Sequence, residues 1–196
     1  MPRSTCCCAR GAIRATGTIT VTNSTFAGSA IGDQFTRGRN QGTDIYADAD
    51  MNVVNSTFVD SQGGSLASPN AASSVRNSLF ATDRSEGAFL CAGRFDGGHN
   101  LSATSDTTCP GTSGQSLSGS LIGARDDSGA VPVFPLTPRG PALGAGADCP
   151  AVDARGAARP AQGCDLGAVQ VSAATAVSLD IAPDSHVYCR ATMTAT

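Results

Sequence analysis

Three segments in the first half of the chain share one pattern of apolar and polar positions. They are residues 19–26 (ITVTNSTF), 51–58 (MNVVNSTF) and 73–80 (SSVRNSLF). In each segment β-forming residues alternate before an Asn-Ser pair, and such alternation is typical of a strand with one buried face. Asparagine tolerates the left-handed backbone of a tight corner. The pattern predicts a strand, a bend at the asparagine, and a short strand with its phenylalanine turned inward; the residues concerned are Asn23, Asn55 and Asn77, followed by Phe26, Phe58 and Phe80.

The spacing of the three asparagines predicts that these segments stack. Asn77 follows Asn55 by 77 − 55 = 22 residues, and Asn55 follows Asn23 by 55 − 23 = 32. A period near 22 residues suits one coil of a right-handed parallel β-helix, in which each coil buries its inner face only by stacking on the next. Equivalent asparagines would lie about 4.8 Å apart, so their amides could hydrogen-bond along the stack. We therefore expect an all-β fold, a right-handed parallel β-helix of few coils.

The longer spacing predicts an insertion between the first two segments. Residues 33–43 are polar and are expected to form a loop, after which a strand resumes at 44–46 and a turn follows at 48–50. Asp44, Asp48 and Asp50 have a spacing at which carboxylates can converge on calcium. A solvated turn is the favoured interpretation, because no matching run of acids recurs in the other segments. We expect no cofactor.

Charge and composition narrow the functional classes. The net charge is −3 and only 15% of residues are charged, which provides neither a basic surface for nucleic acid nor a polybasic patch for a membrane. No apolar run approaches the ~20 residues that cross a bilayer. Residues 1–11 lack the apolar core of a signal peptide, so we interpret the chain as starting partway through a longer protein.

Cysteine usage indicates an oxidising compartment, since eight cysteines are present and four of them are well spaced. Cys91 and Cys109 are 18 residues apart, and Cys149 and Cys164 are 15 apart. Closing loops of this size stabilises a chain by about 3 kcal/mol in the entropy model. We expect these two disulfides, with four unlinked thiols as the alternative. Zinc is less favoured, because no Cys-x₂-Cys pair exists outside the run at 6–8.

From residue 77 onward, a series of motifs resembles one protein family. The series is NSLF at 77–80, Cys91, GGHNL at 97–101, Cys109, PRGPALGAG at 138–146, Cys149-Pro150, DARGAARP at 153–160 and GCDLGA at 163–168. It resembles the end of bacterial right-handed parallel β-helix surface proteins that carry a choice-of-anchor Q domain. The resemblance covers about residues 17–171 and implies an irregular, disulfide-stapled C-terminal cap. Gly144 departs from it, because the family has an acid at that position.

Asp153, Arg155, Arg159 and Asp165 form the densest group of charges in the chain. Such a group could bind a ligand. The favoured interpretation is a structural network of Arg–Asp pairs that holds the cap over the last coil, because the end of a β-helix exposes strand edges that must be covered. His99, alone in its GGHNL motif, is predicted to be a turn residue rather than a base or a metal ligand.

These observations divide the chain into three parts. They are a disordered or truncated start at 1–16, a β-helix with its cap at 17–171, and a tail at 172–196 that resembles the opening strands of a bacterial immunoglobulin-like repeat. The expected function is a non-catalytic structural or adhesion module, secreted or at the cell surface, from a larger surface protein. Its partner would be a surface glycan or protein, without nucleic acid and without a membrane span in this chain.

An enzyme is the main alternative, as a polysaccharide lyase or glycoside hydrolase built on a β-helix. Such enzymes need acids clustered on neighbouring coils. The two positions after each Asn-Ser-x-Phe motif hold a single acid, Asp60, so we expect no catalytic activity. A translated fragment without a function of its own is the third interpretation.

Overall fold

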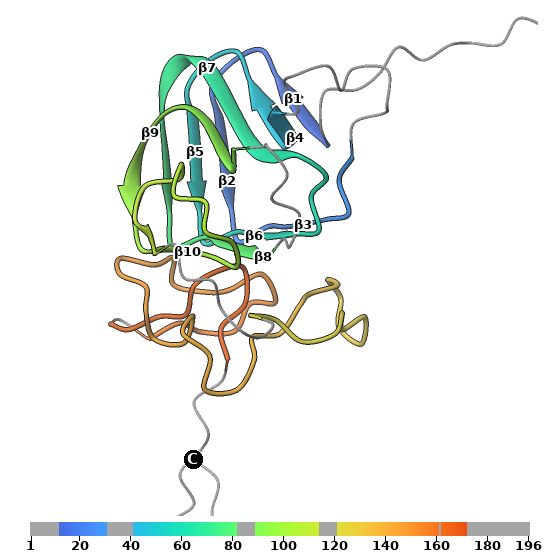
Figure 1. Ribbon diagram of the computed structural model, residues 1–196. Helices are drawn as coiled ribbons and strands as arrows, with labels where there is room; N and C mark the ends of the chain where they lie inside the picture. Colours follow the sequence, from blue (N-terminus) through green and yellow to red (C-terminus); the bar gives the residue numbers. More distant parts are fainter. Residues whose placement is uncertain (1–11, 31–40, 82–88, 114–120, 161, 172–196) are drawn as a thin grey trace, which may run out of the picture.

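The computed structural model describes residues 12–30, 41–81, 89–113, 121–160 and 162–171 (Figure 1). In these ranges every regular element is a β-strand, and the strands form two sheets with parallel pairing. The chain is therefore all-β, as the alternating pattern predicts. Within the same ranges no helix has the length and apolar character needed to cross a membrane.

Sheet A contains the strands that precede each corner. Its order is β1 (Ile13–Ala15), β4 (Gln41–Ala47), β7 (Gly64–Arg76), β5 (Met51–Val54) and β2 (Ile19–Thr22), with β9 (Cys91–Gly98) paired to β7. The long strand β7 pairs with both β4 and β5, because it spans the length that these two strands and their turn cover together.

Sheet B contains the short strands that follow each corner. Its order is β11 (Thr112–Ser113), β10 (Asn100–Ser102), β8 (Leu79–Ala81), β6 (Thr57–Val59) and β3 (Thr25–Ala27). We group the strands of both sheets into repeat 1 (β1, β2, β3), repeat 2 (β4, β5, β6), repeat 3 (β7, β8) and repeat 4 (β9, β10).

The register between repeats agrees with the asparagine spacing. Val53 pairs with Val75 and Phe58 with Phe80, which is 22 residues on in both sheets. The phenylalanines form a column, with ring centroids 5.3 Å apart between Phe26 and Phe58 and 4.9 Å apart between Phe58 and Phe80. The inward position predicted for these rings is correct, because Phe58 and Phe80 are fully buried and Phe26 packs against the same cluster.

Sheet B is covered on both faces, which explains why all three residues of β6 are buried. Its phenylalanines face the valines of sheet A in one apolar cluster. Alternate residues, Val59, Leu79 and Leu101, belong to a second cluster with apolar residues from 121–166. Figure 1 shows this C-terminal part, in yellow to orange, lying against β6, β8 and β10 on the side away from β5 and β7. It contains isolated bridges rather than strands, in keeping with the irregular structure expected there.

Two boundaries differ from the sequence-based expectation. The paired structure begins at Ile13, inside the segment 1–16 that was expected to be disordered, because β1 pairs with β4. Strand β4 begins at Gln41, inside the expected loop 33–43. The tail 172–196, residues 1–11 and the cysteines within them, including Cys189, lie outside the described residues.

Candidate functional site

The corner between the two sheets is built from equivalent residues of the four repeats. Asn23, Asn55 and Asn77 adopt φ values of 50°, 45° and 52°, the left-handed conformation expected of a corner asparagine. His99 occupies the same position in repeat 4 with φ 54°, because its neighbour Gly98 pairs with Arg76. We call these four residues the corner row. The prediction that His99 is a turn residue agrees with this placement.

A second row of side chains runs beside the corner row. The backbone N–H of Ser24 donates to Ser56 Oγ at 3.3 Å, that of Ser56 to Ser78 Oγ at 3.3 Å, and that of Ser78 to Asn100 Oδ1 at 2.9 Å. Each serine hydroxyl also donates to the backbone carbonyl two residues before it, at 3.0–3.1 Å. Each corner serine therefore ties its own bend, and Ser56 and Ser78 also support the preceding repeat.

The amides of the corner row bind the C-terminal part of the chain more than they bind one another. We call residues 142–171, with 161 left out, the strap. Asn23 Nδ2 donates to Val152 O at 2.8 Å, Asn55 Nδ2 to Asp165 O at 3.1 Å, and Asn77 Nδ2 to Ala147 O at 2.6 Å. Asn77 Nδ2 also lies 3.3 Å from Asn55 Oδ1. The expected amide ladder thus has one rung between Asn77 and Asn55, because the backbone of the strap competes for the same donors.

The strap reaches the corner of every repeat, as two further groups of contacts show. His99 Nδ1 lies 3.1 Å from Ala145 O. Thr57 Oγ1 accepts from the N–H of Ala168 at 2.8 Å, and the N–H of Gly167 donates to Asn77 O at 2.8 Å. The strap therefore lies along the side of the stack from repeat 4 to repeat 1, whereas the sequence led us to expect a cap over the last coil.

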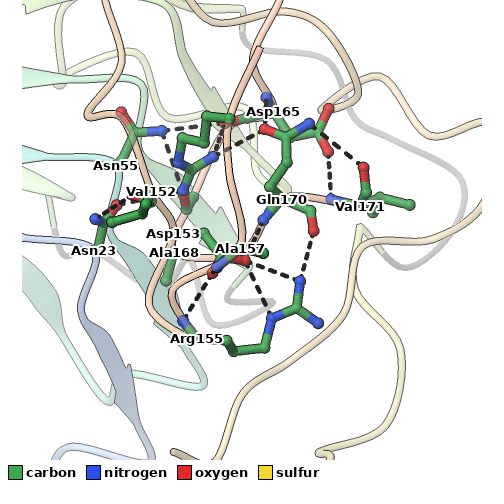
Figure 2. Close-up of polar contacts among 12 residues, drawn as sticks. Asn23, Asn55, Val152, Asp153, Arg155, Ala157, Asp165, Ala168, Gln170 and Val171 are labelled. Carbon is green, nitrogen blue, oxygen red and sulfur yellow. Dashed lines mark hydrogen bonds and ion pairs between the residues drawn. The ribbon is translucent and has the colours of Figure 1, made fainter. Parts of the chain in front are cut away.

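Asp153 organises the polar network within the strap (Figure 2). Asp153 is buried, and its carboxylate accepts from the backbone N–H groups of Arg155, Ala157 and Gln170 at 2.8–3.0 Å. Arg155 adds Nε and Nη2, both to the same carboxylate oxygen, at 3.1 and 2.9 Å. Burial raises the pKa of Asp153, but these hydrogen bonds outweigh it and hold the pKa below the ordinary value.

Arg159 and Asp165 belong to the predicted charge network but do not form a direct ion pair with each other. Arg159 is buried and donates to the carbonyls of Asp165 and Gly167 at 3.0 and 2.8 Å, and to Asn23 Oδ1 at 3.3 Å. The Asp165 carboxylate instead accepts the N–H groups of Gly144 and Val171, at 2.8 and 2.7 Å. Apart from Arg159 Nε, which has no hydrogen-bond partner among the described residues, these groups are used in contacts within the strap and with the corner, which favours the structural interpretation over a ligand site.

Both predicted disulfides are present. Cys91 is bonded to Cys109 and Cys149 to Cys164. The second bond lies next to the corner row, since Cys149 Sγ is 3.4 Å from Asn77 Nδ2. It joins the part of the strap that binds Asn77 to the part that binds Asn55.

The three acids considered for calcium have separate surroundings. Asp44 is buried and accepts from Ser61 Oγ at 2.5 Å, and burial raises its pKa above the ordinary value although the hydroxyls around it oppose this. Asp48 pairs with Arg14 at 2.8 Å on the surface, and Asp50 is exposed. In the described ranges, no group of three or more His, Cys, Asp or Glu side chains is arranged to hold a metal ion.

Sequence reasoning missed several residues of this site. His99 follows Asn77 by 99 − 77 = 22 residues, so the period alone could have placed it in the corner row. The serine after each asparagine was a repeated signal of the second row. Gln170 carried no such signal, although its side-chain oxygen accepts from Arg159 Nη1 at 3.2 Å and from the N–H of Asp165 at 3.0 Å.

No family model, curated protein or solved structure matches the chain. Inferences about its function therefore rest on its own residues and contacts.

Proposed function

We propose that this chain is a right-handed parallel β-helix module with a non-catalytic, structural or adhesive role, secreted or at a bacterial cell surface. The resemblance to surface proteins with a choice-of-anchor Q domain motivates the proposal. The observation that carries it is the strap, which is hydrogen-bonded to the corner of all four repeats. A stack clamped along its side resists the separation of its repeats, as a stiff extracellular stalk or adhesin must.

The disulfides support an extracellular location, because such bonds persist in oxidising compartments and are rare in the cytosol. They are placed where the chain has few apolar residues of its own. Cys149 and Cys164 join two ends of the strap, and Cys91 and Cys109 join β9 to the segment before β11. The first bond therefore closes the strap on itself, and the second holds irregular backbone against a parallel strand.

The outer face of sheet A is the surface that we propose contacts a glycan or protein ligand. Thr20, Asn52, Ser74 and Asp96 are paired in register across the four repeats. They alternate with the buried Val21, Val53 and Val75, so they lie on the opposite face. Ser74 Oγ donates to Asn52 Oδ1 at 2.7 Å. A row of short polar side chains on a regular sheet suits hydrogen bonding to a repeating or extended ligand.

A protease-accessibility assay on intact cells of the source organism tests the location. We expect external protease to remove this chain while a cytosolic marker stays intact. Protection of the chain until the cells are lysed would contradict the surface role.

An array of glycans and surface proteins tests the adhesive role, with N52R as the variant and S128R as its control. Asn52 lies in the polar row, whereas Ser128 is exposed on a distant loop. We expect binding that N52R removes and S128R keeps. Release of unsaturated or reducing sugars from a polysaccharide panel would instead support the lyase or hydrolase alternative.

A further inference from the structure

The edge of repeat 1 is open on one side among the residues that the structure describes. There β2 pairs only with β5, and β3 pairs only with β6. Ile19 N donates to Asp50 O and Asn23 N donates to Val54 O, both at about 3 Å. Alternate residues of a parallel strand direct their backbone groups to opposite neighbours. The N–H and C=O of Thr20 therefore face the open side.

The row of corner serines continues to this edge and stops with an unused acceptor. In repeats 2 and 3 the serine hydroxyl oxygen accepts a backbone N–H from the preceding repeat, as Ser56 does from Ser24 at 3.3 Å. Ser24 Oγ donates to Thr22 O at 3.0 Å. Within the described ranges it accepts no hydrogen bond. Its free lone pair is thus positioned for the N–H of one more corner.

Two further side chains at this edge lack the partner that their equivalents have. Thr25 Oγ1 is buried with no hydrogen-bond partner among the described residues, whereas the equivalent Thr57 Oγ1 accepts from Ala168 at 2.8 Å. Phe26 stacks on Phe58 through one ring face and ends the aromatic column, and it is only partly buried. Phe26 therefore offers an aromatic face of the kind that stacks between repeats, and Thr25 Oγ1 lacks the strap contact that Thr57 Oγ1 makes.

We propose that this edge binds a β-arc from another polypeptide, in parallel register with repeat 1. By β-arc we mean a strand, an Asn-Ser corner and a short strand carrying an inward aromatic residue. Such a β-arc would continue the stack, since the same parallel pairing already occurs three times between neighbouring repeats. Main-chain pairing would supply affinity, and the Ser24 acceptor and the ring of Phe26 would set the register.

A second copy of this chain fits the edge less well than a separate β-arc. Its repeat 4 cannot stack on repeat 1 through sheet B, because β10 already pairs with β11 on its outer side. Its repeat 1 could approach only through a two-fold axis, which would run the strands antiparallel. The corner-to-corner stacking of parallel repeats would then end at the contact.

A synthetic peptide of residues 49–60 (ADMNVVNSTFVD), blocked at both ends, is the probe. Calorimetric titration into the full chain is expected to show saturable binding of one peptide per chain. The same peptide with its asparagine replaced by alanine should bind more weakly, because alanine does not readily adopt the left-handed corner.

Two substitutions in the chain locate the peptide. S24A removes one hydrogen-bond acceptor and should weaken binding about fivefold. T20P removes the edge-facing N–H at a place where an edge strand tolerates proline, and should abolish binding. S78A is the control, because Ser78 makes the same local bond to its own corner but lies away from the edge; it should leave the affinity unchanged.

Absence of saturable binding, or equal weakening by S24A and S78A, would overturn the proposal. Light scattering of the chain alone supplies a further check. A dimer that T20P dissociates would assign the edge to a second copy instead. This proposal depends on the stacking of the repeats and not on the surface role, so either can fail without the other.

Discussion

Replacing Asn55 separates the two contributions of a corner asparagine, its left-handed backbone and its amide. Asn55 is fully buried with φ 45°. Its amide donates to Asp165 O and Gly167 O at 3.1 and 3.4 Å, and its oxygen accepts from Asn77 Nδ2 at 3.3 Å. All three partners keep another hydrogen bond, to Arg159 or to Ala147. Removing the amide should therefore leave none of them unsatisfied.

The magnitude follows from these contacts. N55G keeps the left-handed conformation and loses the amide bonds, which should lower the free energy of unfolding by about 1–2 kcal/mol. N55A loses the same bonds and adds about 1–2 kcal/mol for alanine in the left-handed region. Glycine is ordinarily the worse residue in a strand, by about 0.5–1 kcal/mol. We therefore expect alanine to be more destabilising than glycine at Asn55, the reverse of the usual order.

Urea unfolding under non-reducing conditions measures these differences. The same two substitutions at Asn52 are the control, because Asn52 lies within strand β5 and is not among the residues with positive φ. There glycine should be the more destabilising. The reasoning is refuted if N55G proves as destabilising as N55A, or if both leave the stability unchanged.

Three other predictions concern the strap and the buried acid. In urea unfolding, G167A should lower the free energy of unfolding by about 1–3 kcal/mol more than G156A does. Both glycines have φ 84°, but an added Cβ would lie 2.5 Å from Thr57 Oγ1 only at Gly167. Equal losses would mean that the strap does not approach sheet B so closely. Replacing Cys149 and Cys164 together with serine should lower the free energy of unfolding by about 3 kcal/mol and speed hydrogen exchange of the strap amides, and unchanged exchange would contradict the role given to this disulfide. Burial raises the pKa of Asp44 above 3.8 in the folded state, so the contribution of this carboxyl to stability is full below pH 3.8 and falls as the pH rises toward the folded pKa. The stability of D44N relative to the native chain should therefore increase with pH. A difference that does not vary with pH would show that this carboxyl does not titrate differently on folding.

The repeating part of the fold could be predicted from the sequence, because short runs of neighbouring residues specify its strands and corners. Alternation up to Asn-Ser and a phenylalanine two residues later predicted the strands, the corners and the inward position of the phenylalanines. The spacing of 22 residues predicted the register that pairs Val53 with Val75. The two disulfides were also predictable, since their cysteines close short loops in segments with few apolar residues.

The position of the strap was decided by tertiary structure alone. Charged residues such as Asp153 and Arg159 predict a polar network, but they do not identify the repeats that it contacts. Their partners are mostly backbone carbonyls and N–H groups, which carry no sequence signal. The same reason explains why the expected amide ladder has one rung and why Arg159 pairs with carbonyls rather than with the carboxylate of Asp165. Local patterns in the sequence specify which residues turn the chain and which face inward. Only the folded chain determined that the strap, residues 142–160 and 162–171, lies along the corners that those asparagines build.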